Sequence, residues 1–308
     1  MHIVIVGPGA LGCLFAATLH RGTTTTADRI SLLDYNENRA DRLNSQGIQY
    51  EREGITTRFT LPAYSNPLEV DRADALFICV KSYDVDETLD FCAPLMADDC
   101  LLVFMQNGIA HLKHRSVSKG AATVFATTTE GSTYLGPGHV HHAGAGQTRL
   151  GFLDTPRPEH SLLLPRIVER LQAGGIKAGI TESILTGIWR KLFVNVGINA
   201  LTVIHDCKNG ELLEIPEARK QMRQAINEAV KVGEFENIFV ESALENTENV
   251  CRATAGNISS MLQDVRKKRK TEIDAINGMI IKMAGIHGLA TPANSSLVER
   301  VKKIEARY

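Results

Sequence analysis

The sequence predicts an α/β protein of two domains, an N-terminal domain built on a parallel sheet and an all-helical C-terminal domain. Short apolar runs alternate with helical patterns over the first 180 residues, as a parallel sheet with crossover helices requires. A glycine-rich turn joins the first run to the first helical pattern. Beyond residue 180 only helical patterns occur, so we place the domain boundary between residues 181 and 182 and expect domains 1–181 and 182–308.

The strands expected in the N-terminal domain are short runs of apolar residues. Ala75–Val80 is apolar at every position, which suits a strand covered on both faces. His139–His142 and Thr148–Phe152 flank Gly144–Gln147 and are expected to form a hairpin added to the sheet. The other expected elements are the strands His2–Val6, Ile30–Leu33, Leu101–Met105 and Ala122–Ala126, and the helices Ala10–His20, Arg39–Gln46 and Asp86–Met96.

The C-terminal domain begins with the pattern of an amphipathic helix. Leu185, Trp189, Leu192 and Val196 recur at spacings of 4, 3 and 4, which is the apolar stripe of a helix that packs on a core. Two further long helical patterns follow, at Pro216–Val240 and Ser260–His287.

Composition and charge argue against nucleic acid and membrane as partners. The 308 residues include 34 basic and 35 acidic side chains, a formal net charge of −1. The basic run Arg266–Lys270 is interleaved with acidic residues and is interpreted as a solvated helix face. No apolar stretch approaches the roughly 18 residues of a membrane span, and no basic segment precedes the apolar N-terminus as in a secretory signal. These features predict a cytoplasmic protein.

Neither a disulfide framework nor a metal site is expected. The six cysteines form no C-x-x-C pair, and in a chain without a secretory signal reduced, mostly buried thiols are the better interpretation. His139, His141 and His142 could be metal ligands, but no carboxylate or cysteine is suitably spaced beside them. A position on the surface of the expected hairpin explains them better.

The segment Gly7-Pro-Gly9-Ala10-Leu11-Gly12 follows an expected strand and opens an expected helix. In that context the first glycine permits a tight turn, the second lets the backbone approach a pyrophosphate, and the third lets the helix pack on the strand. The phosphates would then lie at the helix N-terminus, where backbone N–H groups and the helix dipole favour negative charge. The motif predicts a Rossmann-type dinucleotide site; the alternative is a turn without a ligand.

Three further positions follow expected strands, where ligands bind in such sheets. Asp34 ends the second strand, roughly 20 residues beyond the last motif glycine, where a carboxylate accepts hydrogen bonds from the ribose hydroxyls of NAD and repels a 2′-phosphate. The alternative is that Asp34 caps the following helix, whose first turn would begin near Asn36. Lys81 and Asn107 follow the next two buried strands and could face phosphate, nicotinamide or substrate, or could be ordinary polar loop residues.

A row of polar residues lies within an otherwise apolar helical pattern in the C-terminal domain. Lys191, Asn195 and Asn199 are four residues apart, so they share nearly one face of a helix. Such a row either lines a cleft or faces solvent. Ser259 or Ser260 can cap the helix that follows them in the sequence.

Together these segments resemble the ketopantoate reductases (2-dehydropantoate 2-reductases). The resemblance spreads in the family's order over nearly the whole chain, and the lysine–asparagine helix combined with SSMLQD…KTEIDAING is its most specific part. The matching segments are GPGALG at Gly7–Gly12, VKSYD at Val80–Asp84, QNG at Gln106–Gly108, WRKLFVNVGINAL at Trp189–Leu201, CKNGEL at Cys207–Leu212 and SSMLQD…KTEIDAING at Ser259–Gly278.

The resemblance implies a Rossmann-type domain, an all-helical domain and an active site in the cleft between them. It implies reduction of 2-dehydropantoate to (R)-pantoate, a step of pantothenate and coenzyme A synthesis. Lys191 matches the lysine that donates a proton to the ketone oxygen, and Glu272 matches a carboxylate near that lysine and the substrate. The positions matching groups that hold substrate are Asn195, Asn199, Asn209 and Ser260, and Lys81 and Asn107 match cleft positions that contact cofactor and substrate.

One departure from the family pattern concerns the cofactor, NADP or NAD. The family typically uses NADPH, with an arginine shortly after the second strand to receive the 2′-phosphate. Here that strand ends at Asp34, and the first arginine beyond it is Arg39. We therefore expect NADH to be used at least as well as NADPH.

The same departure leaves other functions open. NAD-dependent D-2-hydroxyacid dehydrogenases of the mandelate type, which act on bulky 2-keto acids, resemble this family too. A non-catalytic dinucleotide sensor is a third reading, against which Lys191, Glu272 and Ser260 argue, because a sensor needs no proton donor beside the nicotinamide. The expected partner is in each catalytic reading a small 2-keto acid. The residues leave the oligomeric state open, a homodimer included.

Overall fold

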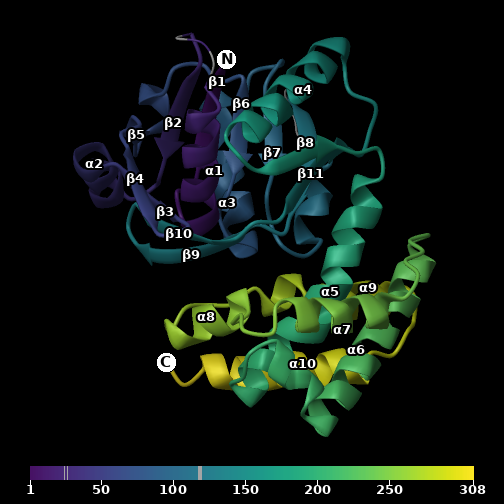
Figure 1. The fold of residues 1–308 in the computed structure, drawn as a ribbon. Coiled ribbons are helices and arrows are strands. Elements are labelled where there is room, and N and C mark those ends of the chain that lie inside the picture. The colour runs from purple at the N-terminus through teal and green to yellow at the C-terminus, as the bar shows by residue number, and fades with distance from the viewer. Residues whose placement is uncertain (24, 26, 117–119) are drawn as a thin grey trace. The chain divides into compact units, whose positions relative to one another are not determined.

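The computed structural model describes residues 1–23, 25, 27–116 and 120–308. It divides into two compact units. Unit 1 consists of Met1–Gln106 and His111–Ile184, and unit 2 of Asn107–Ala110 and Leu185–Tyr308. The sheets lie in unit 1 and the bundle of helices in unit 2 (Figure 1), so the α/β fold with a helical C-terminal region is confirmed. The four-residue segment Asn107–Ala110 belongs to unit 2 although its neighbours on both sides belong to unit 1.

An eight-stranded sheet forms the centre of unit 1, in the order β12-β11-β8-β7-β6-β1-β2-β5. The strands from β8 to β5 run parallel, β11 is antiparallel to β8, and β12 is parallel to β11. Their bounds are β1 His2–Val6, β2 Arg29–Leu33, β5 Ala63–Tyr64, β6 Ala75–Ile78, β7 Leu101–Phe104, β8 Ala122–Thr128, β11 Gln147–Phe152 and β12 Lys177–Ile180. All five strands expected from apolar runs are therefore present, because burial on both faces selects such runs.

The carboxyl ends of β1, β6, β7 and β8 meet at one edge of this sheet. In the register, Val6 lies opposite Ile78, Ile78 opposite Phe104, and Phe104 opposite Phe125. The segments after these strands therefore share the edge at which ligands bind in doubly wound sheets.

The expected hairpin at residues 139–152 is wrong, because its two strands belong to different sheets. β10 (His139–Gly144) pairs with β9 (Gly131–Gly136) and with β3 (Ile48–Arg52), whereas β11 joins the large sheet. With β4 (Ile55–Phe59) these strands form a four-stranded sheet in the order β4-β3-β10-β9. Both edges of β10 are occupied, one by β9 and the other by β3, so β10 has no free edge with which β11 could pair.

Helix α1 (Ala10–Arg21) contacts strands of both sheets and so fills the space between them (Figure 1). Leu14, Phe15 and Leu19 of α1 are fully buried in the core they share. The other helices of unit 1 are α2 Glu37–Gln46, α3 Val85–Cys92 and α4 Pro158–Ala173, and α4 packs on α1 and β12.

Among the described residues, the regular secondary structure of unit 2 is helical. The helices are α5 Ile184–His205, whose first residue belongs to unit 1, α6 Pro216–Phe235, α7 Ala243–Ala253, α8 Ser260–Arg266, α9 Asn277–Ile286 and α10 Pro292–Glu305. Trp189, Leu192 and Val196 of the expected stripe are buried, and Leu185 is half-buried. Among the described residues, no helix is long and apolar enough to cross a membrane.

The helical pattern at Ser260–His287 is not one helix. α8 ends at Arg266, Lys268 has a positive φ of 52°, and a 3-10 turn at Ile273–Ala275 precedes α9. Most of the basic run therefore lies beyond the helix in which it was expected, although all five of its residues are exposed as predicted.

Candidate active site

The glycine-rich turn has the local geometry that a dinucleotide site requires. Gly7 ends β1 with a φ of +82°, a left-handed conformation that favours glycine. A Cβ at Gly12 would overlap the carbonyl oxygen of Gly7, so only glycine lets α1 start this close to the turn. A Cβ at Gly9, in contrast, would meet no atom within 4 Å.

These residues fit a bound dinucleotide. The open space beside Gly9 lies at the N-terminus of α1, whose cap residue supplies no side-chain hydrogen bond. The backbone N–H groups of the first turn, which begins with Ala10 and Leu11, are thus not capped by a side chain and can receive a pyrophosphate.

Asp34 follows β2 and is buried, as the ribose-binding interpretation requires. Its Oδ1 accepts a hydrogen bond from the backbone N–H of Asn36 at 2.9 Å. Arg39 holds both carboxylate oxygens, from Nε to Oδ2 at 2.8 Å and from Nη2 to Oδ1 at 2.6 Å. The side chain that caps α2 is that of Asn36, which accepts from the N–H of Arg39 at 3.0 Å, so Asp34 is not the helix cap.

The contact between Arg39 and Asp34 is not among the expectations from the sequence. Its guanidinium lies 5.0 Å from the ring centre of the exposed Tyr35, which directly follows Asp34. The structure therefore places a cation and an aromatic face beside the predicted ribose-binding carboxylate. The five-residue separation of Asp34 and Arg39 across a helix start is the signal that could have identified the pair.

Lys81 and Gln106 follow β6 and β7 at the shared carboxyl edge. Lys81 is half-buried and precedes a 3-10 turn at Ser82–Asp84. Gln106 is buried, and its Nε2 donates to the carbonyl oxygens of Ile78 and Val80 at 2.8 and 3.1 Å. Gln106 therefore ties the end of β7 to the segment that carries Lys81.

Three predicted site residues of unit 2 form one hydrogen-bonded chain. Nζ of Lys191 donates to Oδ1 of Asn107 at 2.9 Å, and Nδ2 of Asn107 donates to Oε2 of Glu272 at 3.1 Å. Glu272 is buried in the break between α8 and α9. A Cβ at Gly108 would overlap the carbonyl oxygen of Ala275, so this glycine lets the segment that carries Asn107 pack against the same break.

The surroundings of Lys191 make its ammonium more acidic than that of an exposed lysine. Burial lowers the pKa of Lys191 from its ordinary 10.5 to about 8, against the opposing effect of the Glu272 carboxylate. The ammonium is therefore protonated at neutral pH and releases its proton more readily than an exposed lysine. That is the property of a general acid suited to neutral pH.

The other two members of the polar row on α5 do not form an exposed stripe. Asn195 is half-buried and Asn199 is buried. Both lie on the helix face of Lys191, one and two turns further along.

Asn209 and Ser260 lie elsewhere in unit 2. Asn209 is buried, its Nδ2 donates to Oγ1 of Thr254 at 2.9 Å, and its Oδ1 is buried without a partner in the structure. Ser260 is exposed in the first turn of α8, and the cap is Ser259, which accepts from the N–H of Leu262 at 3.1 Å. No hydrogen bond in the described structure links Asn209 or Ser260 to Lys191.

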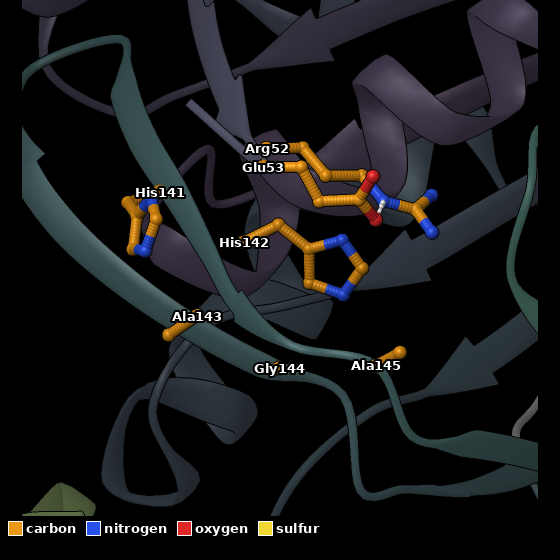
Figure 2. Close-up of a pocket in the computed structure, with 7 residues that line it drawn as sticks. All are labelled: Arg52, Glu53, His141, His142, Ala143, Gly144 and Ala145. Carbon is orange, nitrogen blue, oxygen red and sulfur yellow. Dashed lines mark hydrogen bonds and ion pairs between the residues drawn. The ribbon is translucent and has the colours of Figure 1, made fainter. Parts of the chain in front are cut away.

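Histidines 139, 141 and 142 differ in environment, which corrects their prediction as hairpin surface. His142 is buried, whereas His139 and His141 are partly exposed and lie near Glu51. His142 lines a pocket of about 270 Å³ with Arg52, Glu53 and residues 141–145 (Figure 2). Within the described ranges, no group of three or more His, Cys, Asp or Glu side chains is placed to hold a metal ion.

The cysteines have the properties of core residues. All six are free, and five are buried. Burial raises the pKa of Cys13, which lies beside the glycine-rich turn, to about 12. Thiols of this kind are poor nucleophiles at neutral pH.

Comparison with known proteins covers both units. A family model described as "Ketopantoate reductase PanE/ApbA" matches residues 3–155, and one described as "Ketopantoate reductase PanE/ApbA C terminal" matches residues 183–305. The chain is 32% identical over 305 residues to the 2-dehydropantoate 2-reductase of Halobacterium salinarum, covering 98% of both chains. It is also 32% identical over 316 residues to that of Vibrio cholerae, covering 100% of this chain and 99% of the relative.

Solved structures show the same likeness. A D-mandelate dehydrogenase in a ternary structure with NADH and anilino(oxo)acetate has a TM-score of 0.90 and 27% identity, over 100% of this chain and 99% of that chain. The probable 2-dehydropantoate 2-reductase of Bacillus subtilis has a TM-score of 0.83 and 25% identity, over 99% and 100%. By its family-model matches and its relatives, the chain belongs to the ketopantoate reductase family.

Proposed function

We propose that this protein reduces 2-dehydropantoate to (R)-pantoate with a reduced nicotinamide dinucleotide, a step of pantothenate and hence coenzyme A biosynthesis. The observation that carries the proposal is the hydrogen-bonded chain Lys191–Asn107–Glu272 in a member of the ketopantoate reductase family. An ammonium with a pKa of about 8, hydrogen-bonded to an amide, is a suitable proton donor for a ketone oxygen.

Cofactor binding is assigned to unit 1 and to Asn107 of unit 2. The glycine-rich turn at Gly7–Gly12 receives the pyrophosphate, Asp34 the adenine ribose, and Lys81 the part of the cofactor that lies over the end of β6. When bound, the nicotinamide supplies the hydride. Asn107 is assigned to both cofactor and substrate.

Proton donation is assigned to Lys191. As the keto carbon accepts the hydride, negative charge develops on its oxygen, and the proton moves from Nζ of Lys191 to that oxygen. Asn107 orients Nζ through its hydrogen bond, and Glu272 favours the charged form of the lysine. The reaction thus consumes one hydride and one proton per ketone and leaves an alcohol.

Substrate orientation is assigned to neutral polar groups of unit 2. Asn195 and Asn199 extend the face of α5 that carries Lys191, and their amides can bind a substrate carboxylate and hydroxyl without adding charge. Asn209 and Ser260 are assigned to the same role through the family resemblance, and the buried, unpartnered Oδ1 of Asn209 supports a ligand contact there.

For the cofactor, we propose that NADH is used at least as well as NADPH. The buried carboxylate of Asp34 repels a 2′-phosphate, and the nearby arginine, Arg39, is engaged by both oxygens of that carboxylate. A preference of a hundredfold for NADPH in kcat/KM would contradict the proposal.

The decisive experiment is an initial-rate assay of the pure protein with 2-dehydropantoate and each reduced nicotinamide in turn. We expect turnover with both cofactors, and a loss of roughly 10²- to 10⁴-fold in the Lys191→Ala variant. Undiminished turnover by that variant would show that the assigned mechanism is wrong.

A second candidate is an NAD-dependent D-2-hydroxyacid dehydrogenase. The likeness to the D-mandelate dehydrogenase, together with Asp34, favours it. Parallel assays with 2-dehydropantoate and benzoylformate distinguish the two functions, and a higher kcat/KM for benzoylformate would favour the dehydrogenase.

A further inference from the structure

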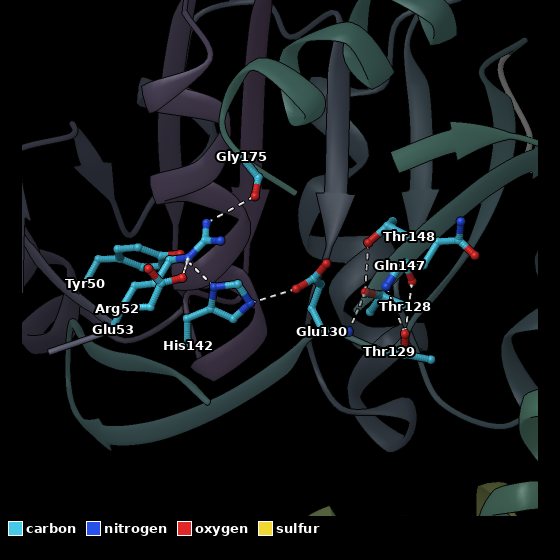
Figure 3. Close-up of polar contacts among 10 residues, drawn as sticks. All are labelled: Tyr50, Arg52, Glu53, Thr128, Thr129, Glu130, His142, Gln147, Thr148 and Gly175. Atoms are coloured by element: carbon cyan, nitrogen blue, oxygen red, sulfur yellow. Dashed lines mark hydrogen bonds and ion pairs between the residues drawn. The ribbon is translucent and has the colours of Figure 1, made fainter. Parts of the chain in front are cut away.

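A buried chain of polar side chains in unit 1 has no role in the mechanism above. The hydroxyl of Tyr50, on β3, lies 2.9 Å from Nδ1 of His142, on β10 (Figure 3). Nε2 of His142 lies 2.7 Å from Oε2 of Glu130, in the connection between β8 and β9. Only 2% of the His142 side chain and 1% of the Glu130 side chain are exposed. We refer to these three residues as the Tyr50–His142–Glu130 network.

His142 joins the other two groups through its two ring nitrogens. A carboxylate oxygen accepts hydrogen bonds, so Nε2–H of His142 donates to Glu130, while Nδ1 shares a hydrogen bond with the hydroxyl of Tyr50. Burial raises the pKa of Tyr50, which keeps that hydroxyl protonated. A buried carboxylate that loses its donor is strongly destabilised. The position of Glu130 therefore depends on His142.

Glu130 lies just beyond the end of β8, at the ligand-binding edge of the large sheet. The strand order at this edge is β2-β1-β6-β7-β8. Asp34 after β2 is assigned to the adenine ribose, and the turn after β1 to the pyrophosphate. The nicotinamide half of the cofactor must then extend from β1 in the other direction, over the ends of β6, β7 and β8.

The end of β8 is fixed from two sides. On one side, the N–H of Thr129 donates to the carbonyl oxygen of Gln147 at 3.0 Å, and the N–H of Gln147 donates to Oγ1 of Thr129 at 2.9 Å (Figure 3). On the other side, His142 holds the side chain of Glu130 from the four-stranded sheet. Residues of both sheets therefore hold this short segment in place through hydrogen bonds.

We propose that Glu130 and His142 are positioning residues that fix the segment Thr128–Gly131 as the wall against which the nicotinamide half of the cofactor docks. The inference rests on the proposed function. Neither side chain has to touch the cofactor, because both act through the backbone of the strand end. Loss of the network should therefore weaken binding of the nicotinamide half and leave the adenine half, more than three strands away in the sheet order, unaffected.

The test compares NADH with ADP-ribose, which lacks only the nicotinamide. For His142→Leu in the full chain we expect the Kd of NADH to rise about tenfold or more while the Kd of ADP-ribose changes less than about twofold. His142→Gln, which keeps an N–H donor near the position of Nε2, should restore most of the NADH affinity. The matched control is His139→Gln on the same strand, where the histidine also lies 2.7 Å from a carboxylate, that of Glu51, but is partly exposed. It should leave both constants unchanged.

Several results would overturn the inference. Equal weakening of NADH and ADP-ribose by His142→Leu would assign the network a purely structural role, and unchanged NADH binding would assign it none in positioning. If His142→Leu fails to fold, Glu130→Gln and Tyr50→Phe carry the same comparison, because each keeps the shape of its side chain. Failure of the wild-type protein to bind either ligand would contradict the proposed function itself, and is thereby distinguished from failure of this inference.

Discussion

Lys191 carries the pH dependence of the proposed reaction. Its ammonium must be protonated to act as the acid, and burial lowers its pKa to about 8. We predict that kcat/KM for ketone reduction is level below pH 8 and falls roughly tenfold per pH unit above it, as the free enzyme loses this proton. Initial rates at low substrate across pH 6 to 10 measure the profile. A level profile through pH 10 would contradict the assignment.

Glu272 should set where that decline begins. Its carboxylate raises the pKa of Lys191, so Glu272→Gln is predicted to move the decline to lower pH while the hydrogen bond from Asn107 remains possible. The matched control is Asp274→Asn, two residues away, whose exposed carboxylate pairs with Lys302 at 2.7 Å. That variant should leave the profile in place. A shift to higher pH in Glu272→Gln would exclude the electrostatic role.

Asp34 is predicted to govern cofactor preference through Arg39. Asp34→Ser removes the carboxylate that repels a 2′-phosphate and frees a guanidinium that now donates to both of its oxygens. Hydrogen bonds to a charged group contribute about 1.5–3 kcal/mol, so the NADPH/NADH ratio of kcat/KM should rise roughly 10- to 100-fold. Asp41→Ser, at an exposed position of α2, is the control and should leave the ratio unchanged. An unchanged ratio in Asp34→Ser would show that the pair does not select the cofactor.

At this scale, the sequence indicates which residues carry chemistry better than it indicates their partners. Lys191, Asn107 and Glu272 are each expected from motifs, but Asn107 and Glu272 are 165 residues apart, and no local spacing reveals their hydrogen bond. The Tyr50–His142–Glu130 network is missed for the same reason, since Tyr50 and His142 are 92 residues apart on strands of one small sheet. Residue type and local spacing are visible in a sequence, whereas contacts between distant strands depend on the fold.

At the scale of elements, two glycines at the start of α1 have different roles. Gly9 is predicted to matter for cofactor binding and Gly12 for folding. A Cβ at Gly9 meets open space, so Gly9→Ala should fold normally but weaken NADH binding by filling the approach of the pyrophosphate. A Cβ at Gly12 overlaps the backbone of Gly7, and this strain outweighs the gain in helix propensity, about 1 kcal/mol for Gly to Ala. Gly12→Ala should therefore lower the free energy of unfolding by about 1–3 kcal/mol.

Urea denaturation and NADH titration of the two variants check this contrast. The interpretation of the turn would be wrong if Gly9→Ala were the less stable variant and bound NADH like the wild type.

The strands that the sequence predicts most directly are those buried over their whole length. β1, β6 and β7 are buried along their whole length, and their continuous apolar runs reveal them. β4, with the sequence ITTRF, is exposed at four of its five positions, and its pairing with β3 rather than its composition makes it a strand. The break between α8 and α9 is likewise hidden, because the segment 266–276, which carries Glu272, contains neither glycine nor proline to indicate a helix end.

For the whole molecule, the two units are predicted to contribute separable parts of the activity. The glycine-rich turn belongs to unit 1 and Lys191 belongs to unit 2. The two units meet in the sequence between Gln106 and Asn107. The Gln106 side chain is hydrogen-bonded within unit 1, and the Asn107 side chain is hydrogen-bonded within unit 2. A ligand that binds only the folded protein stabilises it by an amount that grows with its concentration relative to Kd, about 2.7 kcal/mol at a hundredfold excess. The rise in Tm on adding NADH therefore reports binding without any turnover.

We predict that Lys191→Ala retains the wild-type rise in Tm with NADH although its kcat falls roughly 10²- to 10⁴-fold. Gly9→Val should show the reverse dependence: its Tm without ligand stays near that of the wild type, because the added side chain starts in open space, while the rise with NADH is lost. Thermal denaturation of both full-length variants with and without NADH, beside their initial rates, measures all four quantities. If Lys191→Ala lost the NADH-induced rise, the lysine would be needed for cofactor binding, and proton donation could no longer explain its effect on turnover.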